Sequence, residues 1–382
     1  MDRLSSLPPE LLSTIWDLAC DPEERLKKPL SKTLLPYFRQ NLYREIRISS
    51  SSSLSKLLEA VKSHPSLGLL VFSLDTSEIP ENTGGHRRLK KVLRHLPSLR
   101  SLSIHQVLSF SPIYDNLPQL ASNLQSISFI CMNLRSQDAD ILSRITGLKS
   151  VAISFLAFEN KSESLQTDFT STPCANVRIL SMTCLDDKVL YHPLRWTKKL
   201  GHLVDRYFQH ITHLCIADNC YSDYRSLLGN LDTVETSIES LALRSDTLGE
   251  FCSISSQHLL PRFKNLKHLE LGEGTVSFPL AVYLRQIPHL QSLELAAGTH
   301  LDDLTLEDLL SVIDGPSRAE SLRLLVVDSI NGKMEIGRRI DSSDAAVELV
   351  SHTLEEDGWL VPSTGNWDLE DLSILLESGI RN

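Results

Sequence analysis

The feature that most limits how this chain can fold is a short leucine pattern that recurs along it. The pattern is Leu-x-x-Leu-x-Leu, in which Ile, Val, Phe or Met can replace Leu. Nine clean copies start at Leu99, Leu124, Leu148, Val177, Ile211, Ile238, Leu266, Leu290 and Leu322. Successive copies start 24 to 34 residues apart, and two less regular copies start at Tyr43 and Leu67. A single copy means little, but nine in register predict a repeat architecture.

Each copy predicts a short β-strand followed by a crossover. The x-Leu-x triplet alternates with period two, so its central Leu points inward and the two flanking residues point outward. Strands of successive copies are expected to lie parallel, which requires crossovers of a dozen or more residues. Three crossovers, Leu54–Val61, Leu89–Leu96 and Leu306–Ile313, have apolar residues at helical spacing. A further apolar residue stands three positions before several copies and is expected to fold onto the core: Leu96, Ile145, Phe208, Phe263 and Ile287.

Over about residues 43–330 this pattern resembles the leucine-rich-repeat family. The resemblance implies an α/β leucine-rich-repeat solenoid, with parallel strands on a concave face and helices on a convex face, assigned here to residues 43–335. The family pattern continues to an Asn or Cys eight residues after the first Leu. In this chain only Asn219 fits that position, whereas Val107 and Met132, for example, do not. We therefore expect an irregular array whose turns are satisfied individually.

The two ends of the chain are expected to cap the array. Residues 336–382 predict a helical C-terminal cap, because apolar residues recur at helical spacing in Ser343–Leu354 and Trp367–Ser378. Residues 1–42 contain the run Leu7-Pro8-Pro9-Glu10-Leu11-Leu12, with Ile15 three residues later. This run resembles the start of the F-box. In that family it binds a Skp-type adaptor that joins a cullin–RING ubiquitin ligase, which implies adaptor contacts at Leu7, Pro8, Leu11, Leu12 and Ile15. The alternative is that residues 1–42 form only an N-terminal cap.

Composition excludes several classes of function. The formal net charge of −10 argues against nucleic acid as a partner, because phosphate binding needs a basic surface. The seven cysteines are dispersed and odd in number, which favours reduced thiols in the cytoplasm or nucleus. Neither a signal peptide nor an apolar run long enough to span a membrane is present, and no nucleotide-binding, hydrolase or metalloprotease motif occurs. We therefore expect no cofactor, no membrane partner and no enzyme.

Three local clusters allow two interpretations each. Two His and two Cys between His210 and Cys220 could suggest zinc, but the repeat register makes them ordinary strand and turn residues. A basic run from Arg87 to Arg94 is either a solvated convex face or a partner-docking patch. The serine run Ser49–Ser53 predicts a loop that ends in a helix N-cap, with phosphorylation as the other possibility.

The sequence predicts a substrate-recognition subunit of an SCF-type cullin–RING ubiquitin ligase, in which the repeats bind an unidentified protein substrate. The alternative is a leucine-rich-repeat interaction scaffold with no link to ubiquitin. In the later copies, the outward positions combine imidazole, carboxylate and apolar side chains, which are the groups that binding hot spots need. We expect the substrate to contact His213, His268, Glu270, Ser292, Glu294, Leu324 and Val326. A competing interpretation is that the C-terminal helices cover Leu324 and Val326.

Overall fold

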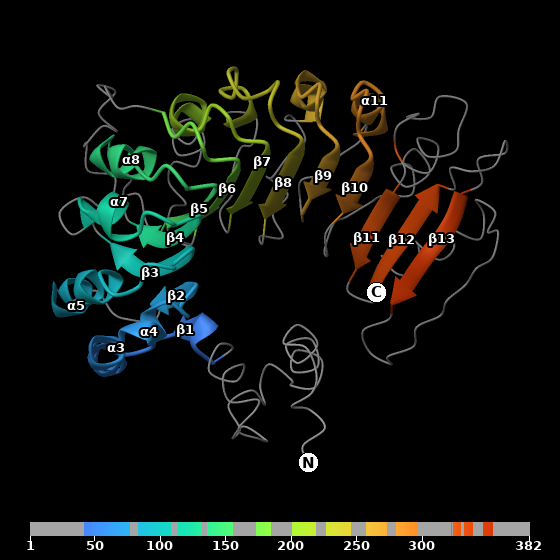
Figure 1. The fold of residues 1–382 in the computed structure, drawn as a ribbon. Helices are drawn as coiled ribbons and strands as arrows, with labels where there is room; N and C mark the ends of the chain where they lie inside the picture. Colours follow the sequence, from blue (N-terminus) through green and yellow to red (C-terminus); the bar gives the residue numbers. More distant parts are fainter. Residues whose placement is uncertain are drawn as a thin grey trace, which may run out of the picture. The chain divides into compact units, whose positions relative to one another are not determined.

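The computed structural model divides the chain into two compact units, Met1–Lys149 and Ser150–Asn382 (Figure 1). The structure describes residues 42–76, 83–107, 114–131, 136–155, 173–184, 201–218, 227–245, 257–272, 280–295, 322, 324–329, 332–338 and 347–353. The F-box-like run from Leu7 to Ile15 and the predicted helix Trp367–Ser378 lie outside the described residues.

The first unit builds a parallel sheet from four strands in chain order. These are β1 (Glu45–Arg47), β2 (Ser73–Thr76), β3 (Ser101–Val107) and β4 (Ser126–Cys131). Each strand is in register with the next, so Glu45, Ser73, Ser101 and Ser126 form one row across the sheet. The register shifts between Ile104 and Val107, and Val107 stays in β3 where the regular family pattern would begin its turn.

Helices fill the crossovers of this unit and lie along one side of its sheet (Figure 1). They are α3 (Ser51–Ser63), α4 (Pro65–Gly68), α5 (Thr83–Leu93), α7 (Leu117–Leu120) and α8 (Ser136–Ser143). The apolar stripes predicted at Leu54–Val61 and Leu89–Leu96 become the inner faces of α3 and α5: Leu54, Leu57, Val61, Leu89, Val92, Leu93 and Leu96 are all buried. The helix predicted over Leu306–Ile313 lies outside the described residues.

The start of α3 differs in detail from the serine-run prediction. Ser50 is the N-cap, and its Oγ accepts the Ser53 backbone N–H at 3.2 Å. The rest of the predicted loop, from Ser51 to Ser53, forms the first turn of the helix itself. The run therefore supplies a helix N-cap as expected. The cap is Ser50, however, so the helix begins at Ser51, inside the run that was predicted to be a loop.

The second unit continues the same plan with parallel strands in chain order. These are β5 (Ser150–Phe155), β6 (Ile179–Cys184), β7 (His213–Asp218), β8 (Ser240–Ser245), β9 (His268–Leu271), β10 (Ser292–Leu295) and β11 (Leu324–Ser329). The helices that the structure describes in its crossovers are shorter than α3 and α5. They include a helix at 201–207, the 3-10 helix η2 (Gln257–Arg262) and α11 (Leu280–Leu284).

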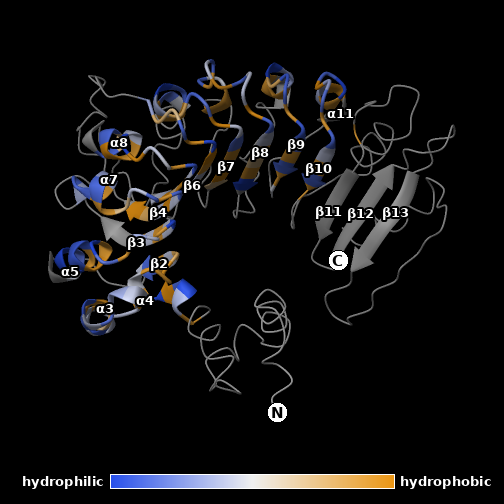
Figure 2. Cartoon of the chain, in the orientation of Figure 1, coloured by the Kyte–Doolittle hydropathy of each residue, from blue (hydrophilic) through white to orange (hydrophobic). Residues whose placement is uncertain are grey.

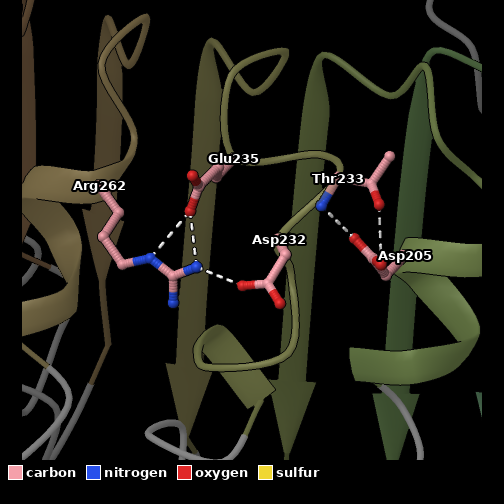
Figure 3. A network of polar contacts seen from close by, with 5 residues as sticks. All are labelled: Asp205, Asp232, Thr233, Glu235 and Arg262. Carbon is pink, nitrogen blue, oxygen red and sulfur yellow. Dashed lines mark hydrogen bonds and ion pairs between the residues drawn. The ribbon is translucent and has the colours of Figure 1, made fainter.

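Side-chain clamps join neighbouring crossovers in this unit (Figure 3). The Thr233 backbone N–H and hydroxyl donate to the two carboxylate oxygens of Asp205, at 2.5 and 2.9 Å. Arg262 donates to Glu235 at 2.8 Å and to Asp232 at 2.5 Å. These bonds connect residues 27 to 30 positions apart, which is one repeat. They hold consecutive repeats together on the crossover side of the sheet.

The core consists of buried columns that run from repeat to repeat. The strand centres of β3 to β10 are buried: Leu102, Ile127, Val151, Leu180, Leu214, Leu241, Leu269 and Leu293. The predicted fold-back residues Leu96, Ile145, Phe208, Phe263 and Ile287 are buried as well. In several repeats the carbonyl of this residue accepts the N–H three positions later, for example Leu266 N–H to Phe263 O at 3.1 Å. One tight turn thus buries two apolar side chains while its backbone stays hydrogen-bonded. The solenoid prediction is confirmed.

The helical C-terminal cap predicted over Ser343–Leu354 is wrong. Residues Val347–Thr353 form strand β13, which pairs antiparallel with β12 (Gly332–Arg338), and β12 pairs antiparallel with β11. Val347 and Leu349 alternate with Glu348, a period that suits a strand as well as a helix. The outer edge of β11 would otherwise present a row of unpaired backbone groups, and the hairpin pairs with it. The sheet therefore extends across the boundary at residue 335 that the sequence suggested.

Candidate binding surface

The candidate binding surface is the outward strand face of the second unit. It contains five of the seven predicted substrate contacts, and the other two, Leu324 and Val326, follow the same rows in the backbone register of β11. Its first row follows the register His213, Ser240, His268, Ser292 and Leu324. Its second row follows Cys215, Ala242, Glu270, Glu294 and Val326. Directly paired residues on adjacent strands project from the same face, about 5 Å apart. The structure thus places the predicted residues in two adjacent rows, although their role in binding stays a prediction.

The rows differ from inward positions in hydropathy. The inward residues Leu269, Leu271, Leu293 and Leu295 are buried, whereas His268 is exposed and Glu270, Ser292 and Glu294 are half-buried. The alternation of hydrophobic and hydrophilic residues is visible along β9 and β10 in Figure 2. Glu270 and Glu294 each lie between two buried leucines of the same strand. These leucines hold the backbone in place, which gives the surface a defined geometry.

A charged cluster forms in the second row. The Arg244 guanidinium binds Glu270 through two hydrogen bonds, Nε to Oε1 and Nη2 to Oε2, the second at 2.9 Å. Arg244 is 52% exposed and Glu270 19% exposed. This bond to Glu270 raises the pKa of Arg244, and the nearby carboxylate of Glu294 contributes in the same direction. The guanidinium of Arg244 therefore lies close to two carboxylates, those of Glu270 and Glu294.

Histidines and a second ion pair lie beside this cluster. His268 Nδ1 shares a hydrogen bond with Ser292 Oγ at 2.8 Å. Just before these strands, Lys267 Nζ binds Glu239 Oε2 at 2.8 Å. The hydrogen bond from Lys267 lowers the pKa of Glu239, and the charges of Lys267, His213 and His268 add to this effect. The exposed imidazoles therefore lie near the Lys267–Glu239 ion pair, whose two charges balance each other.

The environment of Cys215 is that of an ordinary strand residue rather than that of a reactive thiol. Its side chain is half-buried in the second row, and burial raises the pKa of its thiol, which keeps it protonated at neutral pH. His210 and His213 are exposed, and Cys220 lies outside the described residues. Among the residues that the structure describes, no three His, Cys, Asp or Glu side chains gather closely enough to hold a metal ion.

Two residues of this surface were not predicted from the sequence. Arg244 lies two positions after Ala242 on β8, so extending the period-two pattern by one step would have found it. Ile179, the outward residue of β6 that pairs with His213, is 45% exposed and adds an apolar end to the first row. Leu324 and Val326 instead pair with Gly337 and Glu335 of β12, so a strand, not the predicted helix, is the next element beside them.

Comparison with known proteins adds little to this geometry. No family model and no curated protein matches the chain. Two solved structures are similar in fold. The leucine-rich-repeat-containing protein LegL7 from Legionella pneumophila shares 17% identity, with a TM-score of 0.45 over 75% of this chain and 91% of LegL7. A TLR13–ssRNA13 complex shares 13% identity, with a TM-score of 0.32 over 70% of this chain and 44% of the TLR13 chain.

The assignment as a leucine-rich-repeat solenoid rests on the strand register and the buried columns of this chain. Within the described residues, no helix combines the length and the apolar character needed to cross a bilayer. The fold is one whose regular strand face commonly serves to bind other proteins.

Proposed function

We propose that this chain is a non-catalytic protein receptor whose second unit binds a partner on the outward face of β7 to β10. The observation that carries this proposal is the ordered cluster of Arg244, Glu270 and Glu294 on anchored strands. A surface whose side chains are held in place before binding loses less conformational freedom when a partner arrives. Such a surface is suited to recognition rather than to chemistry.

The chemistry of the surface favours a cationic segment with an apolar neighbour. Glu270 already binds Arg244, and Glu294 adds a second carboxylate directly beside it. These two carboxylates would attract a Lys or Arg of the partner. Ile179, Cys215 and Ala242 offer apolar contact on the strands that precede the cluster. Apolar anchors surrounded by complementary charge are typical of binding hot spots.

The proposed site can be tested by removing its charge without changing its shape. The variant Glu270→Gln with Glu294→Gln should weaken binding to a Lys-rich probe peptide that contains one Leu, measured by fluorescence anisotropy. Two lost exposed charge contacts correspond to a change of about fivefold. Ser103→Gln with Ser128→Gln makes matched outward changes in the first unit and should leave binding unchanged. Equal weakening by both pairs, or none by either, would remove the site from this surface.

We further propose that residues 1–42 link this receptor, in the cytoplasm or nucleus, to a Skp-type adaptor and a cullin–RING ubiquitin ligase. The support is the F-box-like run that includes Leu7, Leu11, Leu12 and Ile15. The second candidate is an interaction scaffold with no ubiquitin link, which the repeats support equally well. The two differ only in what the N-terminal segment binds.

Affinity purification with mass spectrometry separates the two candidates. The full chain should recover the adaptor, and a chain that lacks residues 1–42 should not. Leu12→Asp should also abolish recovery, because it places an unpaired charge in an apolar contact. Retention of the adaptor by either variant contradicts the F-box assignment but leaves the strand-face site intact.

A further inference from the structure

The helix side of the first unit carries a concentrated positive charge that the proposed function does not use. Arg87, Arg88, Lys91 and Arg94 are exposed in and just after α5, and Lys90 is half-buried. Arg87, Lys91 and Arg94 follow the spacing i, i+4, i+7 and thus line one stripe of the helix. At a rise of about 1.5 Å per residue, this stripe is about 10 Å long.

The neighbouring helix adds to this charge. Helix α3 packs beside α5 and exposes Lys56 and Lys62, with Glu59 as its one acidic side chain. No ion pair joins the α5 cations to another side chain among the residues that the structure describes. The two helices therefore carry a local excess of positive charge in a chain of formal net charge −10.

An exposed apolar side chain lies at the end of the cationic stripe. Leu69 is 54% exposed and directly follows Gly68, the last residue of α4. Gly68 approaches the backbone of His95 so closely that a Cβ there would overlap the His95 carbonyl. This approach places the backbone that directly precedes Leu69 against His95, the residue after Arg94. The surface thus combines a row of cations with one apolar contact.

We propose that this surface, defined by Arg87, Lys91, Arg94 and Leu69, docks a short acidic segment of a partner protein that contains an apolar residue. Carboxylates of the segment would bind the three cations, and its apolar side chain would cover Leu69. This partner is distinct from the cationic one proposed for the second unit, since the two surfaces have opposite charge. The inference does not depend on the ubiquitin link.

The charge distribution favours an acidic peptide over nucleic acid or a membrane. Fixed charges are screened over about 8 Å at physiological salt, close to the length of the stripe. A short segment is attracted within that range, whereas a long polyanion extends past the stripe and meets a chain that is acidic overall. Binding of single-stranded nucleic acid also relies on aromatic stacking, and neither α3 nor α5 contains Phe, Tyr or Trp.

The test measures binding of a labelled Glu- and Asp-rich peptide with one Leu to the full chain by fluorescence anisotropy. The variant Arg87→Ser, Lys91→Ser and Arg94→Ser should weaken binding by about tenfold, as expected for three exposed charge contacts. The matched control Arg144→Ser with Lys149→Ser removes exposed cations elsewhere in the same unit and should leave binding unchanged. Leu69→Ser should lower affinity for this peptide but not for a version in which its Leu is replaced by Ser.

Parallel measurements identify the partner class. Labelled oligo-dT and vesicles that contain phosphatidylserine should bind more weakly than the acidic peptide. The proposal is overturned if the wild-type chain does not bind the peptide, or if the triple variant binds it as the wild type does. Tighter binding of oligo-dT or vesicles through the same three cations would also overturn it, as would self-association of the chain that the triple variant abolishes.

Discussion

The two units of this chain share one core plan but differ at several outward positions. On the strand face of the first unit the outward residues are mainly Ser: Ser73, Ser101, Ser103, Ser126 and Ser128. The corresponding rows of the second unit contain His213, His268, Glu270 and Glu294. The helix sides differ as well. The first unit has the long basic helices α3 and α5, whereas the helices that the structure describes in the crossovers of the second are shorter.

This difference teaches how a repeat protein separates stability from recognition. Inward positions are fixed by packing against the previous and next repeat, so both units keep the same leucine columns. Outward positions are not under that constraint and can carry charge of either sign. The crossovers can also vary, provided that each connects to its neighbour. Buried crossover residues make this connection in both units, for example Leu89 in the first and Tyr207 in the second, and in the second unit the clamps around Asp205 and Arg262 add to it (Figure 3).

The largest effect should come from truncating the shared core. Leu102→Ala in the first unit and Leu269→Ala in the second each remove a side chain that is almost completely buried. Each should lower the free energy of unfolding by ~2–5 kcal/mol, because the lost contacts leave a cavity in a packed column. Urea denaturation followed by circular dichroism measures the change. A large loss in one unit with almost none in the other would show that the two cores are not equivalent.

The core could be predicted from the sequence because its signal is local and repeated. The positions of Leu102 and Leu269 follow from a spacing of a few residues that recurs in every repeat. The stripes that form α3 and α5 were visible for the same reason. Strand β13 was not predicted, since Val347 and Leu349 fit either period and pairing with β12 decided between them.

The site was only partly predictable for a different physical reason. Which residues point outward follows from period-two alternation, so His268, Glu270 and Glu294 could be named. Their partners depend on the register between strands. Arg244 binds Glu270 across 26 residues of sequence. The buried bond between His86 Nδ1 and Tyr114 Oη, at 2.6 Å, likewise joins residues 28 positions apart and has no local signal.

A smaller effect is expected where the crossovers approach one another closely. A Cβ on Gly68 would overlap the carbonyl of His95, whereas one on Gly201 would lie 2.8 Å from Leu227 O and 2.9 Å from the side chain of Asn230. Gly68→Ala should therefore be destabilising by about 1–3 kcal/mol, and Gly201→Ala by less, because the overlap with a backbone carbonyl is much deeper in the first case. Thermal unfolding of both variants tests this order. The reverse order would mean that the first unit accommodates the extra methyl group more easily.

The clamps of the second unit should contribute about 1 kcal/mol. Arg262→Ala removes the bonds to Asp232 and Glu235, a partly exposed network that joins two crossovers. Arg144→Ala in the first unit is the matched control. Among the described residues, the Arg144 guanidinium donates to the backbone carbonyl of Asp140, one turn earlier, at 3.3 Å, and to no side chain. The control should change stability by less than about 0.5 kcal/mol. Equal effects in urea denaturation would indicate that the Arg262 network does not join the repeats energetically.

The smallest effects should occur at the outward strand positions, where the two units differ most. Ser128→Ala and Ser292→Ala remove hydroxyls from half-buried side chains that flank buried strand centres. The Ser292 hydroxyl bonds only to the exposed His268 ring, which can bind water instead. Both variants should therefore stay within about 0.5 kcal/mol of the wild type in urea denaturation. Leu293→Ala, one position after Ser292, should cost several times more because its side chain is buried. If Ser292→Ala and Leu293→Ala were equally destabilising, the register of β10 would be wrong by one residue, and the charged surface would point into the core.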